Sequence, residues 1–400
     1  MIFKRLFFNN VKRDDMTKFS NNAGKIRMVV VVILVEFFIS CTNVNEPEFP
    51  VLSVDVSKMN PPSVFDIFEK IEIIPLETTN NSLIGGQADN IDFFDNHYYV
   101  LDGRTDSFYC FDEHGRFVRK IGNKGAGPEE YFLATNFAIN KSNHVVELLN
   151  PFGIIYTYEL SGKFVSKTQL PDLVPNYQEI MLLNDSIRIL RSSTHNNNEN
   201  QLYAYSNQSN TIVNSFYKEN PAINGFNLLS FYHYNNGIYF YKPLKSAVFK
   251  IDQHGFEVAY SWDFGALNPE KAELDSDITS ERIAEMYMNA QIKGIYNIQY
   301  QNDDYYYTLF RRYVNQDLVN INVLYDKRTN RKIVFDNFKE GLRFFPIFWC
   351  DNYVLATSSL FRERNVGKTV DPMVLDEANS NILNTIEEDD NPFILKYYFK

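Results

Sequence analysis

The chain has 400 residues, of which 44% are hydrophobic and 22% are charged. This length allows one large domain or two to three ordinary ones, and the composition is that of a globular protein. The formal net charge of −11, with no long basic stretch, argues against nucleic-acid binding, which needs a cationic surface. Aromatic residues make up 16% of the chain, and such residues favour β-strands.

Residues 1–40 have the organisation of an export signal. Basic residues precede an apolar run, Met28 to Ile39, which is too short to cross a hydrocarbon core of ~30 Å as a helix. The segment ahead of this run is long, so Met16 is an alternative start. We predict that residues 1–40 are a signal peptide; a membrane anchor is the alternative interpretation.

The end of this segment, Phe38-Ile39-Ser40-Cys41, resembles the lipobox of bacterial lipoproteins. It departs from the family pattern in two places, because Phe38 replaces the usual aliphatic residue and Glu36 interrupts the apolar run. The resemblance implies that Cys41 is acylated and becomes the mature N-terminus, which places the protein in the cell envelope. The expected location is the outer membrane, on its periplasmic or surface side, and an ordinary signal peptide is the alternative.

The residues after Cys41 are polar and contain proline, and we expect residues 41–62 to be a tether between the lipid and the folded domain. The acidic composition would not favour contact with anionic lipids, so the acyl group would have to hold the protein at the membrane. We expect the folded domain to cover residues 63–400.

A repeat of about 47 residues decides the expected fold. Each repeat has a turn after an aromatic or aliphatic strand end; the first four turns are at 111–115, 158–162, 205–207 and 251–255. The fifth, at 325–328, follows a longer interval that contains an extra helical segment. Each turn is flanked by apolar or alternating runs of four to eight residues, as strands require. Four strands per repeat of this length predict a β-propeller blade.

The strand count predicts how the ring closes. A sixth repeat ends with the chain and lacks one strand, whereas an unassigned strand, residues 70–76, lies near the mature N-terminus. Pairing that strand with residues 393–399 completes an all-β, six-bladed propeller of four-stranded antiparallel blades. Seven or eight blades, or two β-sandwiches, are the alternatives.

The segment Ile121-Gly122-Asn123-Lys124-Gly125-Ala126-Gly127-Pro128-Glu129-Glu130-Tyr131 resembles the link between blades in NHL-repeat propellers, and more closely in bacterial six-bladed propeller lipoproteins. The resemblance covers most of the mature chain but weakens after the second blade. It implies a fold and a place in the cell envelope, and no reaction. A phosphate cradle is the alternative for these glycines, but it needs a following helix, and a strand follows here.

All long insertions belong to two classes of connection. Residues 192–200, 312–318 and 359–392 join second to third strands, and residues 265–293 join two blades. In a propeller these connections emerge on one face, and we expect recognition to occur there. A helical insert is expected at about 274–292, with a helix over Asp277–Gln291 capped by Asp277.

We expect a binding module for a glycan, a peptide or an envelope protein. The candidate ligand-binding residues are on loops of the elaborated face and can stack or donate hydrogen bonds: Tyr131, Tyr177, Arg312, Arg362 and Arg364. The alternative is a propeller enzyme, a lyase, hydrolase or lactonase, with its site at the mouth of the channel. No catalytic motif nominates its residues.

We expect no cofactor and no metal, although two cation sites are conceivable. A lactonase-type site would use residues near the inner strands: Asp89, Asn90, Asn136 and Asn297. The acidic run at 387–390 could bind calcium but is more simply a solvated surface. The six histidines are scattered, and none of their spacings predicts a metal cluster.

Overall fold

The computed structural model describes residues 48–400 except 86–87, 89, 172–175, 194–198, 227–228, 276, 359–374 and 388. The chain divides into two compact units, Met1–Glu48 and Phe49–Lys400, and the fold below is that of the second unit. Within the described residues, no helix is both long enough and apolar enough to span a membrane.

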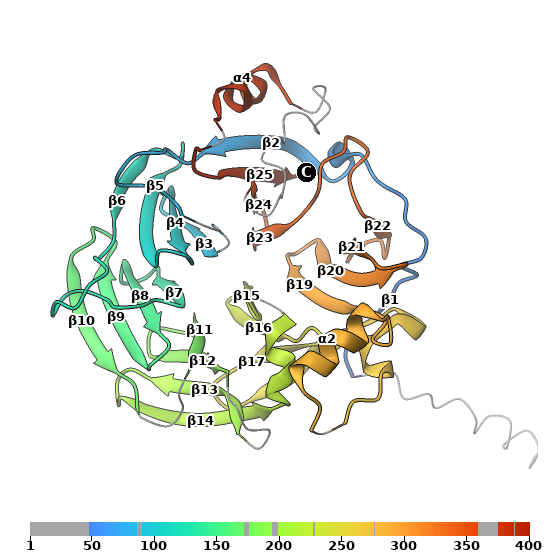
Figure 1. Ribbon diagram of the computed structural model, residues 1–400, viewed down its shortest axis with the longest axis horizontal. Helices are drawn as coiled ribbons and strands as arrows, with labels where there is room; N and C mark the ends of the chain where they lie inside the picture. The colour runs from blue at the N-terminus through green and yellow to red at the C-terminus, as the bar shows by residue number, and fades with distance from the viewer. Residues whose placement is uncertain are drawn as a thin grey trace, which may run out of the picture. The chain divides into compact units, whose positions relative to one another are not determined.

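Six antiparallel sheets form the blades of a ring, so the predicted six-bladed propeller is confirmed (Figure 1). We number the blades along the chain and give the strands of each from the channel outward. The bounds are: blade 1, β3 (Asn90–Phe94), β4 (His97–Asp102), β5 (Ser107–Asp112) and β6 (Phe117–Lys120); blade 2, β7 (Asn136–Asn140), β8 (Val145–Asn150), β9 (Ile154–Glu159) and β10 (Phe164–Gln169); blade 3, β11 (Tyr177–Leu182), β12 (Ile187–Ser192), β13 (Asn200–Ser206) and β14 (Thr211–Lys218); blade 4, β15 (Phe231–Tyr234), β16 (Gly237–Tyr241), β17 (Ala247–Ile251) and β18 (Phe256–Asp263); blade 5, β19 (Ile295–Gln301), β20 (Tyr305–Val314), β21 (Asp317–Asp326) and β22 (Lys332–Phe335); blade 6, β23 (Pro346–Trp349), β24 (Tyr353–Thr357), β25 (Phe393–Phe399) and β2 (Phe68–Pro75).

The burial pattern explains why the strands differ in sequence. Every residue of the second strand β12 is buried, because neighbouring blades cover both faces of a middle strand. The outermost strand β10 alternates between half-buried and exposed residues, since only one of its faces meets another blade. Continuous burial therefore marks the middle of this blade, and alternation marks the rim of its neighbour.

The ring closes as predicted, through antiparallel pairing of β2 with β25, in which Ile73 lies opposite Leu395. The free edge of β2 is covered by α4 (Glu377–Thr385), which lies outside blade 6 in Figure 1. Asn379 of this helix donates from Nδ2 to the carbonyl oxygen of Ile71 (2.9 Å) and accepts from the backbone nitrogen of Ile73 (2.7 Å). The side chain thus satisfies a strand edge that would otherwise be open to another chain.

Blade 4 has a fifth strand, β1 (Val51–Ser53), which pairs in parallel with β18. We expected these residues in the tether, but they form an edge strand instead. The chain then passes blade 5, where the backbone nitrogen of Asn60 donates to Val334 (2.8 Å), and continues through the 3-10 helix η1 (Val64–Asp66) to β2. The N-terminal segment therefore covers the outer edges of two blades before it closes the third.

The two faces of the ring carry different connections. The short-turn face holds the turns between first and second strands and between third and fourth strands; Asp95 and Asn96, at φ 50° and 58°, form such a turn, and Asn and Asp tolerate this left-handed backbone. The long-loop face holds the insertions. The expected loop at 312–318 is instead the tip of a long hairpin, in which Val314 pairs with Asp317.

The connection between blades 4 and 5 contains the short 3-10 helices η3 (Gly265–Leu267) and η4 (Pro269–Lys271) and the α-helix α2 (Ser280–Met288). The helix is shorter than expected and is capped by Thr279 rather than Asp277, because the Thr279 hydroxyl accepts from the backbone nitrogen of Arg282 (3.3 Å). Its buried residues Ile283 and Tyr287 pack with residues of the 3-10 helix η2 (Pro221–Phe226), which follows blade 3.

Aromatic side chains fill the junction at which the ring closes. Phe68 is fully buried, and its ring lies 5.1 to 6.3 Å from the rings of Phe338, Phe344, Tyr397 and Phe399. Phe338 and Phe344 belong to the link from blade 5, and Tyr397 and Phe399 belong to β25, so one ring joins β2 to blade 6 and to that link. Large rings suit this position because each contributes a large buried area.

We expect Phe68→Ala to lower the free energy of unfolding by about 3–5 kcal/mol, because removing a buried ring leaves a cavity at the closure. Phe65, three positions earlier, is 37% exposed, and we expect Phe65→Ala to change stability by less than about 0.5 kcal/mol. Urea denaturation of both variants measures the difference. Equal losses in the two variants would contradict the role assigned to Phe68.

Candidate functional site

A cavity of about 530 Å³ occupies the central channel of the propeller. Its wall is made by the first strands of the blades, which surround the axis in Figure 1: β3, β7, β11, β15, the end of β19, and β23. Because the first strands of all blades converge on the axis, residues far apart in the sequence face one space. A cavity of this size accommodates a small organic ligand.

The described part of the cavity opens on the short-turn face. Its mouth is formed by turns between first and second strands, which contribute Lys141, Asp185, Asn235 and Asp351 among others. The insertion at 265–293 follows the end of β18 on the opposite face, but its helix α2 packs against η2 instead of lining the cavity. The described part of the cavity therefore does not open on the face at which we expected recognition. A recognition role of the long-loop face stays a prediction.

The charged or titratable side chains that share the channel include Asp92 on β3, Lys141 after β7, and His233 on β15, from three different blades. Enclosure by the channel wall raises the pKa of Asp92, and the positive charge of Lys141 acts against this rise. Enclosure together with the same charge lowers the pKa of His233 to about 4. The ammonium group of Lys141 is therefore close enough to act on side chains of two opposite blades, and His233 is neutral at physiological pH.

Lys141 itself is exposed, and its Nζ lies 5.7 Å from the centre of the Phe94 ring. Its turn is held by Asn140, whose side chain accepts from the backbone nitrogen of Asn143 (3.0 Å). Among the residues that the structure describes, none forms an ion pair with Lys141. The channel mouth thus presents a positive charge that the protein does not neutralise by direct contact.

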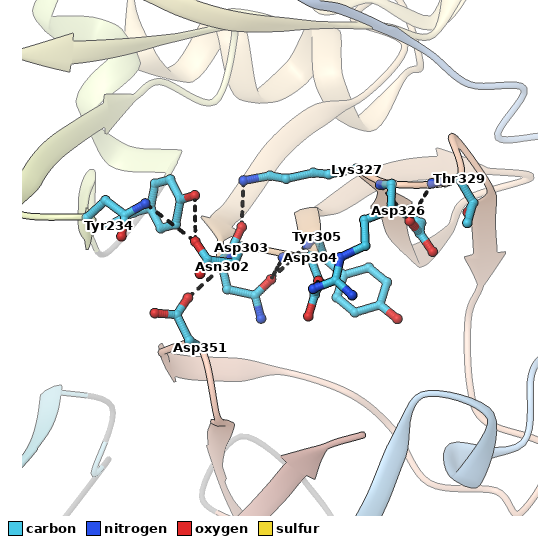
Figure 2. A network of polar contacts seen from close by, with 11 residues as sticks. Tyr234, Asn302, Asp303, Asp304, Tyr305, Asp326, Lys327, Thr329 and Asp351 are labelled. Atoms are coloured by element: carbon cyan, nitrogen blue, oxygen red, sulfur yellow. Dashed lines mark hydrogen bonds and ion pairs between the residues drawn. The ribbon is translucent and has the colours of Figure 1, made fainter.

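The other side of the mouth is a hydrogen-bonded network that joins the turns of blades 4, 5 and 6 (Figure 2). The Asp303 carboxylate accepts from the Tyr234 hydroxyl (3.0 Å) and from Nδ2 of Asn235 (3.4 Å). The backbone nitrogen of Asp303 donates to the Asp351 carboxylate (3.2 Å). These bonds hold three turns in one arrangement, so this arc of the mouth is preorganised.

Lys327 contacts the residues of this network and holds them in place. Its Nζ lies 4.4 Å from the Tyr234 ring centre and 4.3 Å from that of Tyr306, and it donates to Oε1 of Gln301 (3.0 Å) and to the carbonyl oxygen of Asn302 (2.5 Å). Burial lowers the pKa of Lys327 to about 8. The cation–π contacts and hydrogen bonds fix Tyr234 in the wall of the channel, and we assign Lys327 a positioning role.

Glu179 also lines the channel, but its charge is neutralised by an ion pair within the protein. It pairs with Arg191, its cross-strand neighbour on β12, and its second oxygen accepts from the backbone nitrogen of Ser230 (2.8 Å). Both side chains are almost completely buried. The bond to Ser230 links blade 3 to blade 4. Because Glu179 is paired, other residues determine the electrostatic potential of the open channel.

Two of the predicted ligand-binding residues, Tyr131 and Tyr177, lie away from the cavity. Tyr131 and Tyr177 are each 1% exposed. The Tyr131 hydroxyl donates to the carbonyl oxygen of Asp106 (2.8 Å), and the ring of Tyr177 packs against Tyr203. Their burial is explained by packing between blades, because a large ring at the start of a blade fills the space beside its neighbour. A role of either residue in ligand binding stays a prediction.

Arg312 is half-buried on β20, opposite Val319 of the long hairpin, and does not line the cavity. Cys41, Arg362 and Arg364 lie outside the described residues. Of the lactonase-type set, Asp89 is also outside them. The Asn136 side chain accepts from the backbone nitrogen of Ile180 (3.2 Å), and that of Asn297 accepts from Arg311 (3.1 Å), so both have structural partners.

Within the described part of the chain, no three or more His, Cys, Asp or Glu side chains are grouped closely enough to hold a metal ion. The residues that sequence reasoning missed are Asp92, Lys141 and His233. A signal was available, since all three lie on a first strand or in the turn that follows it. The sequence does not reveal which of the many polar residues in such positions point along the channel.

We expect His233 to titrate with a midpoint near pH 4, and Lys141→Met to raise this midpoint, because removal of a positive charge favours the protonated imidazole. The pKa of Asp92 should rise as well. NMR titration of the imidazole and carboxyl signals measures both. Lys167, over the Tyr156 ring at 5.3 Å on the rim of the same blade, provides the matched control, and Lys167→Met should move neither value. A fixed His233 midpoint in Lys141→Met would show that the ammonium does not reach the channel.

Comparison with solved structures finds a protein with the same fold. A "putative exported protein" from Bacteroides fragilis is 18% identical, with a TM-score of 0.69 over 88% of this chain and 99% of that chain. A member of the DUF4221 family from Bacteroides vulgatus is 10% identical, with a TM-score of 0.49 over 86% of this chain and 99% of that chain. A search of curated proteins found no match.

A family model described as "Domain of unknown function (DUF4934)" matches residues 48–398. This range contains every strand of the propeller, including β1 and most of β25. The resemblance to NHL-repeat propellers remains a prediction, since the match is to a different family. The match spans more than half of the sequence, and the chain therefore belongs to the DUF4934 family.

Proposed function

We propose that this protein is an exported, lipid-anchored recognition module that binds a glycan in the central channel. The observation that carries the proposal is the 530 Å³ cavity with convergent polar groups from several blades. A large pocket with a few converging polar groups and perturbed pKa values is the preferred place for ligand binding in a fold of this kind. The preorganised arc of blades 4 to 6 supports recognition, because it reduces the entropy lost on binding.

The wall chemistry suits a hydroxyl-rich ligand. Amide side chains of Asn90, Asn235 and Asn236 offer both donors and acceptors. One ring nitrogen of His233 bonds to the backbone of Gly237, and the neutral imidazole offers the other. Tyr234 and Phe348 provide half-buried aromatic surface beside them. A sugar presents hydroxyl groups at its edges and C–H groups on its faces, so this combination matches a glycan better than a purely apolar compound.

The path of the N-terminal segment is consistent with an anchor on the short-turn side. β18 leads into the long insertion at 265–293, so it begins at the short-turn face, and β1 runs parallel to it. The chain therefore enters blade 4 from the face on which the cavity opens. Residues 42–50 span at most about 30 Å when extended. Acylation of Cys41 would thus keep this side of the propeller close to the membrane.

We expect Cys41→Ala to move the protein from the membrane fraction to the soluble fraction of the cell envelope, because one residue carries the lipid. Metabolic labelling with palmitate, followed by fractionation, measures the change. Cys350→Ala is the control, since Cys350 is a free, half-buried thiol of the propeller, and it should leave anchoring intact. Lipid labelling of the Cys41→Ala variant would contradict the anchor.

We expect glycan binding to depend on His233 and not on His254, which is exposed in the turn between β17 and β18. A panel of neutral and acidic oligosaccharides, titrated into the purified full chain by calorimetry, should give at least one ligand. His233→Ala should weaken its binding about 10-fold, the effect of one or two lost hydrogen bonds, while His254→Ala should not. Failure of the whole panel, or binding of short peptides in its place, would overturn the assignment to glycans.

An enzyme remains a second candidate function because the pKa of Asp92 is raised. A carboxyl group with a raised pKa can act as a general acid in glycoside cleavage. Incubation of the bound oligosaccharide with the protein, followed by chromatography, decides between the two functions. Cleavage that is lost in Asp92→Asn would establish the enzyme, and an unchanged ligand would establish the binding module.

A further inference from the structure

Lys141 is distinguished from the other residues of the channel by its charge. Among the described residues that line the cavity, it is the only lysine or arginine. Two other lysines are enclosed by protein contacts: Lys327 lies between two tyrosine rings, and Lys242 pairs with Glu219 (3.3 Å). The ammonium of Lys141 has no such carboxylate partner within the described residues and is open to the mouth of the cavity.

The mouth carries one positive charge and several negative ones among the described residues. Lys141 belongs to blade 2, whereas the acidic residues Asp303 and Asp351 belong to blades 5 and 6, across the ring (Figure 1). Glu179 does not contribute, because Arg191 neutralises it. The acidic residues Asp92 and Asp185 line the cavity from blades 1 and 3, on either side of blade 2, so Lys141 is the single positive charge of a described lining that is otherwise acidic. A neutral ligand gains nothing from this arrangement, but a ligand with one anionic group would be oriented by it.

We propose that Lys141 binds the carboxylate of an acidic sugar, so that the glycan recognised in the channel contains a uronic acid or another carboxylate-bearing unit. This inference rests on the proposed function and specifies its ligand class. The carboxylate would lie beside Nζ of Lys141, and neutral His233 would remain available for a neighbouring hydroxyl group. Asp303 and Asp351, on the far side, would keep the carboxylate from binding in the reverse orientation.

The surroundings favour a monoanion over a phosphate. Phosphate sites in proteins combine several backbone N–H groups or an arginine fork, and the described lining has no arginine. Asp92, Asp185 and Asp351 also line the cavity and would repel a dianion more strongly than a carboxylate. A single lysine on a turn fixed by Asn140 provides one charge and one direction, which is what a carboxylate needs.

The test compares pairs of oligosaccharides that differ only at C6, where a uronate carries a carboxylate and its neutral counterpart carries a hydroxymethyl group. Calorimetry with the full chain should give at least 10-fold tighter binding of the uronate in one such pair, with an affinity that falls as salt is added. Lys141→Met should abolish this preference, and Lys141→Arg should retain most of it. Lys167→Met, on the rim of the same blade, should behave as the unmodified protein.

The outcomes separate this inference from the proposed function. If the neutral member of each pair binds as tightly as the uronate, or if Lys141→Met keeps the preference, the assignment of Lys141 is overturned while glycan binding stands. If neither member of any pair binds, both proposals are overturned. Because Lys141 is an exposed turn residue, its substitution should leave the melting temperature unchanged, and that measurement confirms that a lost affinity is not a lost fold.

Discussion

The pairing of β2 with β25 is the constraint on which the rest of the structure depends. It joins residues 68–75 to residues 393–399, so the first and last strands of the propeller share one sheet. Closure removes the open blade interfaces at which apolar surface would otherwise meet water. It also fixes the angle between neighbouring blades, because six sheets must complete one turn. The positions of the inner strands, and hence the width of the channel, follow from this closure.

The neighbours of the closing pair show how it is reinforced. Asn379 hydrogen-bonds to the free edge of β2, and Asn391 connects the segment before β25 to the loop after β2 through the carbonyl oxygens of Glu77 (2.9 Å) and Ser82 (2.7 Å). Both asparagines are at least 95% buried. Buried amides with all their groups satisfied specify one register, since a slip by one residue would leave them unpaired.

Much of this architecture could be predicted from the sequence because it depends on periodic features. The repeat of about 47 residues, the turn residues and the spare N-terminal strand each have a local signature. The strand β1 could not be found in this way, since three residues in parallel pairing have no pattern of their own. Its role depends on the free edge of β18, which is a tertiary feature.

The candidate site was less predictable for a geometric reason. Tyr131 and Tyr177 lie next to loops in the sequence, but the chain turns inward at both positions and buries the rings between blades. Whether a polar residue on a first strand faces the channel depends on the twist and register of that strand. Asp92 and His233 come from opposite blades, and no sequence spacing relates them.

The distribution of buried charge connects the stability of the ring to the chemistry of its channel. Blades 2 to 4 are joined by ion pairs with almost no exposure, such as Arg188 with Glu147, whereas the junction of blades 5 and 6 is filled with aromatic rings around Phe344. Removing one member of such an ion pair would leave a buried charge unpaired, so these residues have a structural role in holding the blades together.

Glu179 shows how such a structural role affects the channel. Its carboxylate reaches the cavity wall, but Arg191 and the backbone of Ser230 satisfy both of its oxygens. The electrostatic field inside the channel then comes from charged groups that take no part in ion pairs between blades. Lys141 is the cationic member of that set, because its turn lies at the mouth and its loss would open no blade interface. A residue that contributes charge to a cavity and little to the fold is one whose presence is best explained by what the cavity binds.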